Sequence, residues 1–360
     1  MRAHTTAADL TAAIGRAREL MTPSPTMLAY TGVLLAVDGT VLRVHASDGD
    51  TFGVFDVDVT DTVDGHALLP PGPLHSWLRT LPGDTGITLT CDAGPHLEAA
   101  FGSSEPYKFR TLNATFPPAP RRSSNPAPAP IEGFGAALAA VSASTAGVAD
   151  VAGKVVRLDS GDDGLTLYTT DTFRITRAHL PHSSFGTQSM LLHLRTLHTA
   201  AKWGICGVAM EPTGSVTLTV GGGTITVRPL ATPFPGVETV MEAPAPYSTT
   251  FDTADVLTVL ARVKALAGGA DPVVVDLADE HMGLSIDSET TGSGSETVPV
   301  GFPVDPPARF GLNVDYFRQA LESLGAATAT LQWTSPNAPI RLAAADPLDV
   351  TVIVMPVSLA

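Results

Sequence analysis

Residue types that perform acid chemistry recur in this sequence at a regular place. The segments VHASDGD, LYTTDTF and LSIDSET carry Asp48, Asp171 and Asp287, each at the step from a predicted strand to a turn. Carboxylates can serve as general acids or bases. An enzyme rarely needs its acid three times over, so a structural role in three equivalent turns is the more economical interpretation.

The other candidate sites have simpler structural explanations. His193 and His198 are five residues apart on a predicted helix, a poor spacing for a shared metal site, so a solvated helix face is favoured. SGDDG at 160–164 suggests a calcium loop, but an Asp/Gly turn between strands explains it better. GGG at 221–223 lacks the GK[ST] of a phosphate loop and is typical of a hairpin turn. The sequence contains no Walker, HExxH, CxxC, GxSxG or GxGxxG motif, so we predict a binding or scaffolding protein, not an enzyme, without cofactor or metal.

Composition narrows the class of protein. Hydrophobic residues make up 44% of the 360 residues, which is ample for packed cores. The chain has no apolar run of the roughly 18–20 residues that span a membrane, and MRAHTTAADL lacks the apolar stretch of a signal peptide. We therefore expect a soluble, cytoplasmic protein. Cys91 and Cys206 are expected to be two buried thiols and not a disulfide. The net charge of −15 argues against nucleic acid unless the positive charge is concentrated in one place.

A long internal repeat organises the chain. The helix starts LLPPGPLHSWLRTL, LLHLRTLHTAAKW and GLNVDYFRQALESL align at Leu74, Leu197 and Phe317, which are 123 and 120 residues apart. Solenoid repeats are shorter, roughly 20 to 50 residues, so each repeat is predicted to be a whole domain with its own core. Prolines break the pattern at 117–131 and again at 241–249. The predicted domains are 1–120, 121–243, which begins with the Pro-rich linker, and 244–360.

Each repeat is predicted to contain two helices and several strands, an α+β fold. Alternating stretches such as TVLRVHAS, SVTLTV and DVTVIVM indicate strands. Asp252 is a predicted N-cap and Gly268 a predicted helix stop. The predicted helices cover 7–21, 71–81, 132–145, 192–203, 252–267 and 313–324.

Positive charge is concentrated on these helices. In 192–203, Arg195, His198 and Lys202 form a stripe opposite an apolar stripe of Leu194, Leu197 and Ala201. Ordinary solvated helix faces are the alternative explanation for any single helix. Two copies closing head-to-tail could line a hole with these helices and hold a duplex by sequence-independent attraction to phosphate. The candidate DNA-facing residues are Arg16, Arg18, Arg79, Arg195, Lys202, Arg262 and Arg318.

Taken together, these segments resemble the bacterial sliding clamp, the β subunit of DNA polymerase III. The resemblance covers the whole chain. Its strongest parts are GLNVDYFRQALESL, VTVIVMPVSL, LYTTDTFRITRAHLP, FPGVETV, PTMLAYTGVLLAV and ALLPPGPLHSWLRTLPG. It implies three tandem DNA-clamp domains, a homodimeric ring that encircles duplex DNA, a non-catalytic role in tethering the polymerase, and a clamp loader that opens the ring.

The resemblance also implies a groove for a partner peptide that is Gln-rich and ends in Leu/Phe. Alternation along the last strand predicts that Ile353, Met355 and Val357 face one side, and Arg174, Asn313 and Tyr316 are expected as polar anchors at the rim. By position, the groove would consist of Val151, Thr170, Thr172, Arg174, Ile175, Pro235, Val240, Asn313, Tyr316, Ile353, Met355, Pro356 and Val357.

The chain departs from the family pattern near this groove. Thr172-Phe173 replaces Gly-His, while Ser358 and Thr239 each replace an Arg, and Ser24 stands where a basic residue is often found. This loss of charge suits a phage-encoded or paralogous clamp, such as one that serves a repair polymerase or replaces a drug-targeted clamp. The rivals from other classes are an acidic three-domain surface or adhesion protein and, without any motif to support it, a hydrolase.

Overall fold

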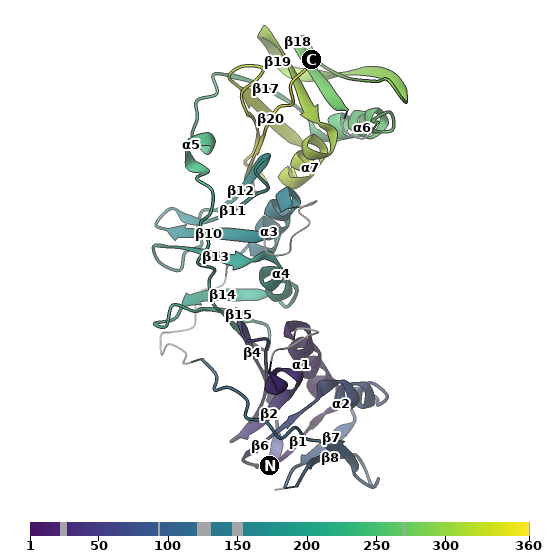
Figure 1. Ribbon diagram of the computed structural model, residues 1–360, viewed down its shortest axis with the longest axis vertical. Coiled ribbons are helices and arrows are strands. Elements are labelled where there is room, and N and C mark those ends of the chain that lie inside the picture. The colour runs from purple at the N-terminus through teal and green to yellow at the C-terminus, as the bar shows by residue number, and fades with distance from the viewer. Residues whose placement is uncertain (22–26, 93, 121–130, 146–153, 269–270, 360) are drawn as a thin grey trace. The chain divides into compact units, whose positions relative to one another are not determined.

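The computed structural model describes residues 1–21, 27–92, 94–120, 131–145, 154–268 and 271–359 (Figure 1). Internal packing divides the chain into two compact units, 1–131 with 198–229 and 132–197 with 230–360. The predicted middle domain contributes strands to both units, so the boundaries near 120 and 243 stay a prediction. None of the described helices is long and apolar enough to cross a membrane.

The first unit is built on two antiparallel sheets. A seven-stranded sheet has the order β14-β15-β16-β4-β3-β2-β6, and a five-stranded sheet has the order β5-β1-β7-β8-β9. The strands are β1 (Arg2–Thr6), β2 (Val33–Asp38), β3 (Val41–Ser47), β4 (Thr51–Asp58), β5 (Thr60–Val63), β6 (Gly65–Leu69), β7 (Gly86–Thr90), β8 (His96–Ala100), β9 (Tyr107–Arg110), β14 (Ile205–Met210), β15 (Val216–Val220) and β16 (Gly223–Val227). The helices are α1 (Ala7–Leu20), α2 (Pro71–Leu78) and the 3₁₀ turn η1 (Leu28–Thr31).

Local sequence explains where α1 and α2 begin. The Thr6 hydroxyl accepts a hydrogen bond from the Asp9 amide at 3.2 Å and caps α1. Pro71 opens α2, where a missing N–H costs nothing. The two helices lie side by side (Figure 1), and Leu10, Ile14 and Leu74 are buried beneath them as the apolar spacing predicts.

The second unit is built on an eight-stranded sheet of order β13-β10-β11-β12-β22-β21-β20-β17 and a long β18-β19 ribbon. Its strands are β10 (Val155–Gly161), β11 (Gly164–Thr170), β12 (Arg174–Leu180), β13 (Gln188–His193), β17 (Tyr247–Asp252), β18 (Pro272–Ser288), β19 (Gly292–Asn313), β20 (Thr328–Trp333), β21 (Ile340–Ala344) and β22 (Asp349–Val354). Its helices are α3 (Phe134–Ser142), η2 (Ala143–Thr145), α5 (Glu238–Met241), α6 (Thr253–Lys264) and α7 (Val314–Leu324), and α4 (Leu194–Lys202) runs across the division between the units.

The predicted helix positions are confirmed, with shifts at the ends. Asp252 caps α6 by accepting from the Asp255 amide at 3.0 Å, but the helix ends at Lys264, four residues before the predicted stop at Gly268. In α4 the buried alanine is Ala200, while Ala201 is half-buried. The predicted hairpin turns at 160–164 and 221–223 are both present, joining β10 to β11 and β15 to β16.

Candidate functional site

The recurrent carboxylates do not form a catalytic or metal centre. Asp48 and Asp171 each accept two backbone amides in a strand-connecting turn. Asp287 differs, because it lies exposed within β18 opposite Ser293. Among the described residues no group of three His, Cys, Asp or Glu could hold a metal ion. The expectation of two buried thiols was wrong, since Cys206 is exposed and Cys91 half-buried, and both are free.

Three of the predicted DNA-facing cations are available to an anion. Arg18 on α1, Arg79 directly after α2 and Arg195 on α4 are all exposed. Within the described ranges no acidic group forms an ion pair with any of them. An exposed guanidinium without an ion pair can bind a phosphate oxygen without first leaving a carboxylate.

The other four predicted cations are already engaged. Lys202 Nζ lies 2.8 Å from Glu19 Oε1, and Arg318 Nη1 lies 2.5 Å from Glu322 Oε1. The remaining two also have partners: Arg262 pairs with Glu296, and Arg16 Nη1 donates to the Gly221 carbonyl at 2.6 Å. The three ion pairs lower the net positive charge at these helices, whereas the bond of Arg16 to a carbonyl orients its charge without neutralising it.

His75 is held neutral beside two of the available cations. Arg18 Nη1 donates to His75 Nδ1 at 2.7 Å, which requires an unprotonated nitrogen. Partial burial, followed by the positive charges of Arg18 and Arg79, lowers the pKa of His75 below its usual value. An anion bound at this point would oppose the effect of the two guanidinium groups.

The residues predicted for the peptide groove gather in the second unit. Thr170, Thr172, Arg174 and Ile175 lie at the β11–β12 turn, and β12 pairs with β22 so that Ile175 stands opposite Ile353. The chain continues past β22, where the Met355 amide donates to the Phe173 carbonyl at 2.9 Å. Val357 then bridges to Gly311 near the start of α7. Val151 lies outside the described residues.

Arg174 is not the rim anchor that the sequence suggested. Its side chain is 1% exposed and its Nε lies 2.9 Å from Asp171 Oδ2. Nη1 donates to Gln319 Oε1, and the guanidinium carbon lies 4.3 Å from the centre of the Tyr316 ring. Arg174 therefore fixes the β11–β12 turn beneath Tyr316. Gln319, which carried no signal in the sequence, completes this support.

The exposed part of the cluster is apolar. Phe173, Met355 and Val357 are 57%, 40% and 40% exposed. The rings of Phe173 and Tyr316 lie 6.3 Å apart, within the range of aromatic interaction. We call Phe173, Tyr316, Met355 and Val357 the apolar patch. Phe173 was noted in the sequence only as a departure from the family pattern.

Two predicted groove residues have structural roles instead. The Asn313 amide oxygen accepts from the amides of Asp315 and Tyr316 and so caps α7. Ile353 is 2% exposed, and β22 ends at Val354, so strand alternation does not carry Ile353 to the same surface as Met355. Ile353 therefore lies beneath the surface of the site, whereas Asn313 is half-buried and caps the helix.

The FPGVETV segment is tied to the sheet of the second unit at one arginine. Arg157 Nη2 lies 2.5 Å from Glu238 Oε1 and 2.6 Å from Asp159 Oδ2, and its guanidinium lies over the Phe234 ring at 5.6 Å. Hydrogen bonds from its own backbone amide and from Arg157 lower the pKa of Glu238. The segment carries Pro235, which is exposed, and Val240, which is half-buried.

Comparison with known proteins shows what the chain is similar to. The sequence family described as "DNA polymerase III beta subunit, C-terminal domain" matches residues 245–358. The beta sliding clamp of Synechococcus elongatus is 26% identical over 351 residues, covering 91% of both chains. That of Micrococcus luteus is 23% identical over 302 residues, covering 81% of this chain and 96% of the relative. The chain is similar to beta sliding clamps along most of its length.

Solved structures show the same fold. The Pseudomonas aeruginosa DNA polymerase sliding clamp aligns over 100% of both chains with a TM-score of 0.86 at 19% identity. The Caulobacter crescentus polymerase III beta subunit aligns over 100% of both chains with a TM-score of 0.87 at 19% identity. The predicted α+β sliding-clamp fold is thereby confirmed. These relatives give no support to a surface or adhesion protein or to a hydrolase.

Proposed function

We propose that this protein acts in DNA replication as a sliding clamp, a non-catalytic processivity factor whose two copies form a ring around duplex DNA. The observation that carries the proposal is the similarity to beta sliding clamps along 91% of the chain. The available cations on α1, after α2 and on α4 supply the attraction to phosphate that such a ring needs. Attraction of this kind is independent of sequence, as a ring that moves along DNA requires.

We propose that partners, among them the polymerase and the clamp loader, dock on the apolar patch. Exposed Phe173 and Met355 offer an adaptable apolar surface, and the buried Arg174–Asp171 pair holds the turn beneath it. Pro235 and Val240 of the FPGVETV segment belong to the proposed docking surface by their position in the family pattern alone. A Phe in place of the family's His favours a more apolar partner peptide than the family pattern suggests.

Two matched sets of substitutions test the role of the cations. The first set replaces by Gln the three cations without an ion pair, and the second set replaces by Gln three cations that already have one. The first set is Arg18, Arg79 and Arg195, and the second set is Lys202, Arg262 and Arg318.

We expect the first set to shorten the lifetime of the protein on closed circular DNA and to flatten its dependence on salt. The slope of log affinity against log salt falls by about 0.9 for each phosphate that the protein no longer neutralises. The second set should change both quantities less, because glutamates already neutralise those cations. If both variant proteins stay on the circular DNA as long as the unsubstituted protein does, the assignment of these residues to DNA binding is wrong.

A further inference from the structure

The turn that supports the apolar patch recurs in the first unit with the same hydrogen bonds to its backbone. Asp48 Oδ1 accepts from the amides of Asp50 and Thr51, as Asp171 Oδ1 accepts from those of Phe173 and Arg174. The hydroxyl group of the residue before each Asp makes the same hydrogen bond in both turns. Ser47 Oγ donates to the Thr51 carbonyl at 2.8 Å, and Thr170 Oγ1 donates to the Arg174 carbonyl at 2.7 Å. Gly49 and Thr172 both have positive φ, at 104° and 76°.

The neighbouring strand repeats too. Thr51 pairs with Val227 as Arg174 pairs with Val354. Past these strands, the Arg228 amide donates to the Asp50 carbonyl at 3.3 Å, as the Met355 amide donates to Phe173. Arg228 in the first unit therefore occupies the place of Met355 in the second, and Asp50 that of Phe173.

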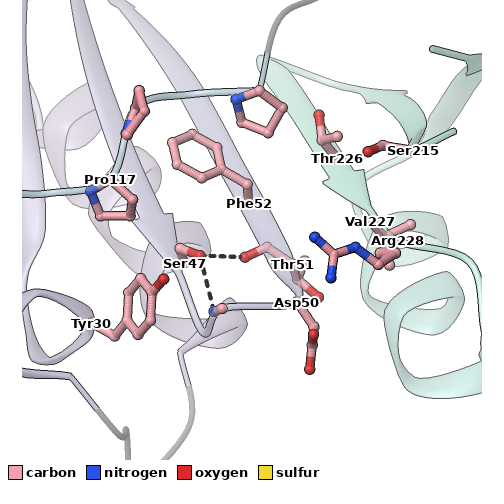
Figure 2. Close-up of a pocket in the computed structure, with 13 residues that line it drawn as sticks. Tyr30, Ser47, Asp50, Thr51, Phe52, Pro117, Ser215, Thr226, Val227 and Arg228 are labelled. Carbon is pink, nitrogen blue, oxygen red and sulfur yellow. Dashed lines mark hydrogen bonds between the residues drawn. The ribbon is translucent and has the colours of Figure 1, made fainter. Parts of the chain in front are cut away.

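A cavity of about 150 Å³ opens at this place in the first unit (Figure 2). The rings of Tyr30, Phe52 and Pro117 line one side of it, and the Arg228 side chain enters from the other. Phe52 is held by an edge interaction with Phe116, with ring centres 5.8 Å apart. A volume of about 150 Å³ is enough for a group the size of benzene. One apolar side chain therefore fits against the rings, and Ser47, Thr226 and Arg228 form the polar part of the lining.

The charge of the rim selects what can bind. Arg228 is exposed, and no acidic group in the described part of the chain pairs with it, whereas the equivalent Met355 is uncharged. Asp50 contributes an opposing negative charge at the same rim. The geometry points to a second peptide-binding site, which takes a short partner peptide carrying one apolar side chain next to a carboxylate. This inference rests on the proposed function, because the peptide-binding role of the apolar patch is itself a proposal.

A labelled acetyl-Leu-Asp-Leu amide, with Leu-Asn-Leu as its neutral counterpart, tests the site by fluorescence anisotropy. The full chain carries Tyr316→Ala and Met355→Ala, so that the apolar patch is disabled. We expect binding that Arg228→Gln weakens about two- to fivefold, as for an exposed charge pair. Asp50→Asn should tighten it, and the neutral peptide should bind more weakly. Arg43→Gln, which removes one positive charge elsewhere on the same sheet, should change nothing.

The inference is overturned if the charged peptide does not bind the double variant, or if Arg228→Gln binds it as tightly as Arg43→Gln does. A Gln-rich peptide ending in Leu-Phe, measured in parallel on the unsubstituted protein, separates the two proposals. If that peptide binds while Leu-Asp-Leu does not, only the second site fails. If neither binds, the peptide-binding role of the apolar patch fails with it.

Discussion

Replacement of Arg174 by Met tests how the apolar patch is held in place. The substitution keeps an apolar stem of similar length but removes the partner of Asp171, whose side chain is 7% exposed. It also removes the bond to Gln319 and the stacking on Tyr316. Breaking a buried ion pair costs about 3–5 kcal/mol, because the remaining charge stays buried without its partner.

We expect the lower end of this range, about 3 kcal/mol, because Asp171 keeps two backbone amides on its other oxygen. Hydrogen exchange followed by mass spectrometry measures the effect locally, which suits a chain of two compact units. The amides of β12 should exchange about 100-fold faster, since each 1.4 kcal/mol is worth about a factor of ten.

Two further variants separate the effect of the buried ion pair from other causes. Arg177→Met lies on the same strand and breaks a pair with Asp349 whose side chains are 27% and 38% exposed, so it should cost less than about 1 kcal/mol. Asp171→Asn keeps the oxygen that accepts the backbone amides, so in the Arg174→Met background it should restore part of the protection. The reasoning is refuted if Arg174→Met exchanges like Arg177→Met, or if the costs of Asp171→Asn and Arg174→Met simply add.

Three further predictions concern other parts of the molecule. Phe317→Ala should cost about 3–5 kcal/mol, because the ring is fully buried, and should lower the thermal unfolding midpoint. Met355→Ala should lower the affinity for a Gln-rich peptide ending in Leu-Phe at least about tenfold in anisotropy titrations, as for a residue at the centre of an interface. Unchanged affinity would exclude Met355 from the site. The lowered pKa of His75 means that the unfolded chain takes up its proton first as pH falls, so this residue reduces stability below about pH 6.5. His75→Gln should therefore make the fall in unfolding midpoint between pH 7 and pH 5 smaller, and an unaltered pH profile would contradict this assignment.

Helices and cores followed directly from the sequence. The spacing that aligned Leu74, Leu197 and Phe317 identified three side chains that are completely buried. Helical periodicity can be read from the sequence because it depends only on residues that are near one another along the chain. Helix ends were less accurate. The last turn of a helix depends on tertiary packing as well as on a stop residue, and α6 ends before Gly268.

The functional surfaces were only half predictable. The sequence identified the cations on the helices but did not show which of them have acidic partners. Lys202, for example, pairs with Glu19, which is 183 residues away in the sequence. Strand alternation grouped Ile353 with Met355, although β22 ends between them. A charged residue such as Arg174 is expected at the rim of a site. It is a buried support here because it packs beneath Tyr316.

The sequence by itself determined the repeat, the α+β class and the family resemblance, because periodicity and motif order are carried by near neighbours along the chain. Tertiary structure alone decided which charges are neutralised, which turn residues are buried, and that Arg228 stands where its counterpart is Met355. Those properties depend on distances between residues that are remote in sequence. Electrostatic and packing energies are set by these distances and by burial, so no local pattern could have supplied them.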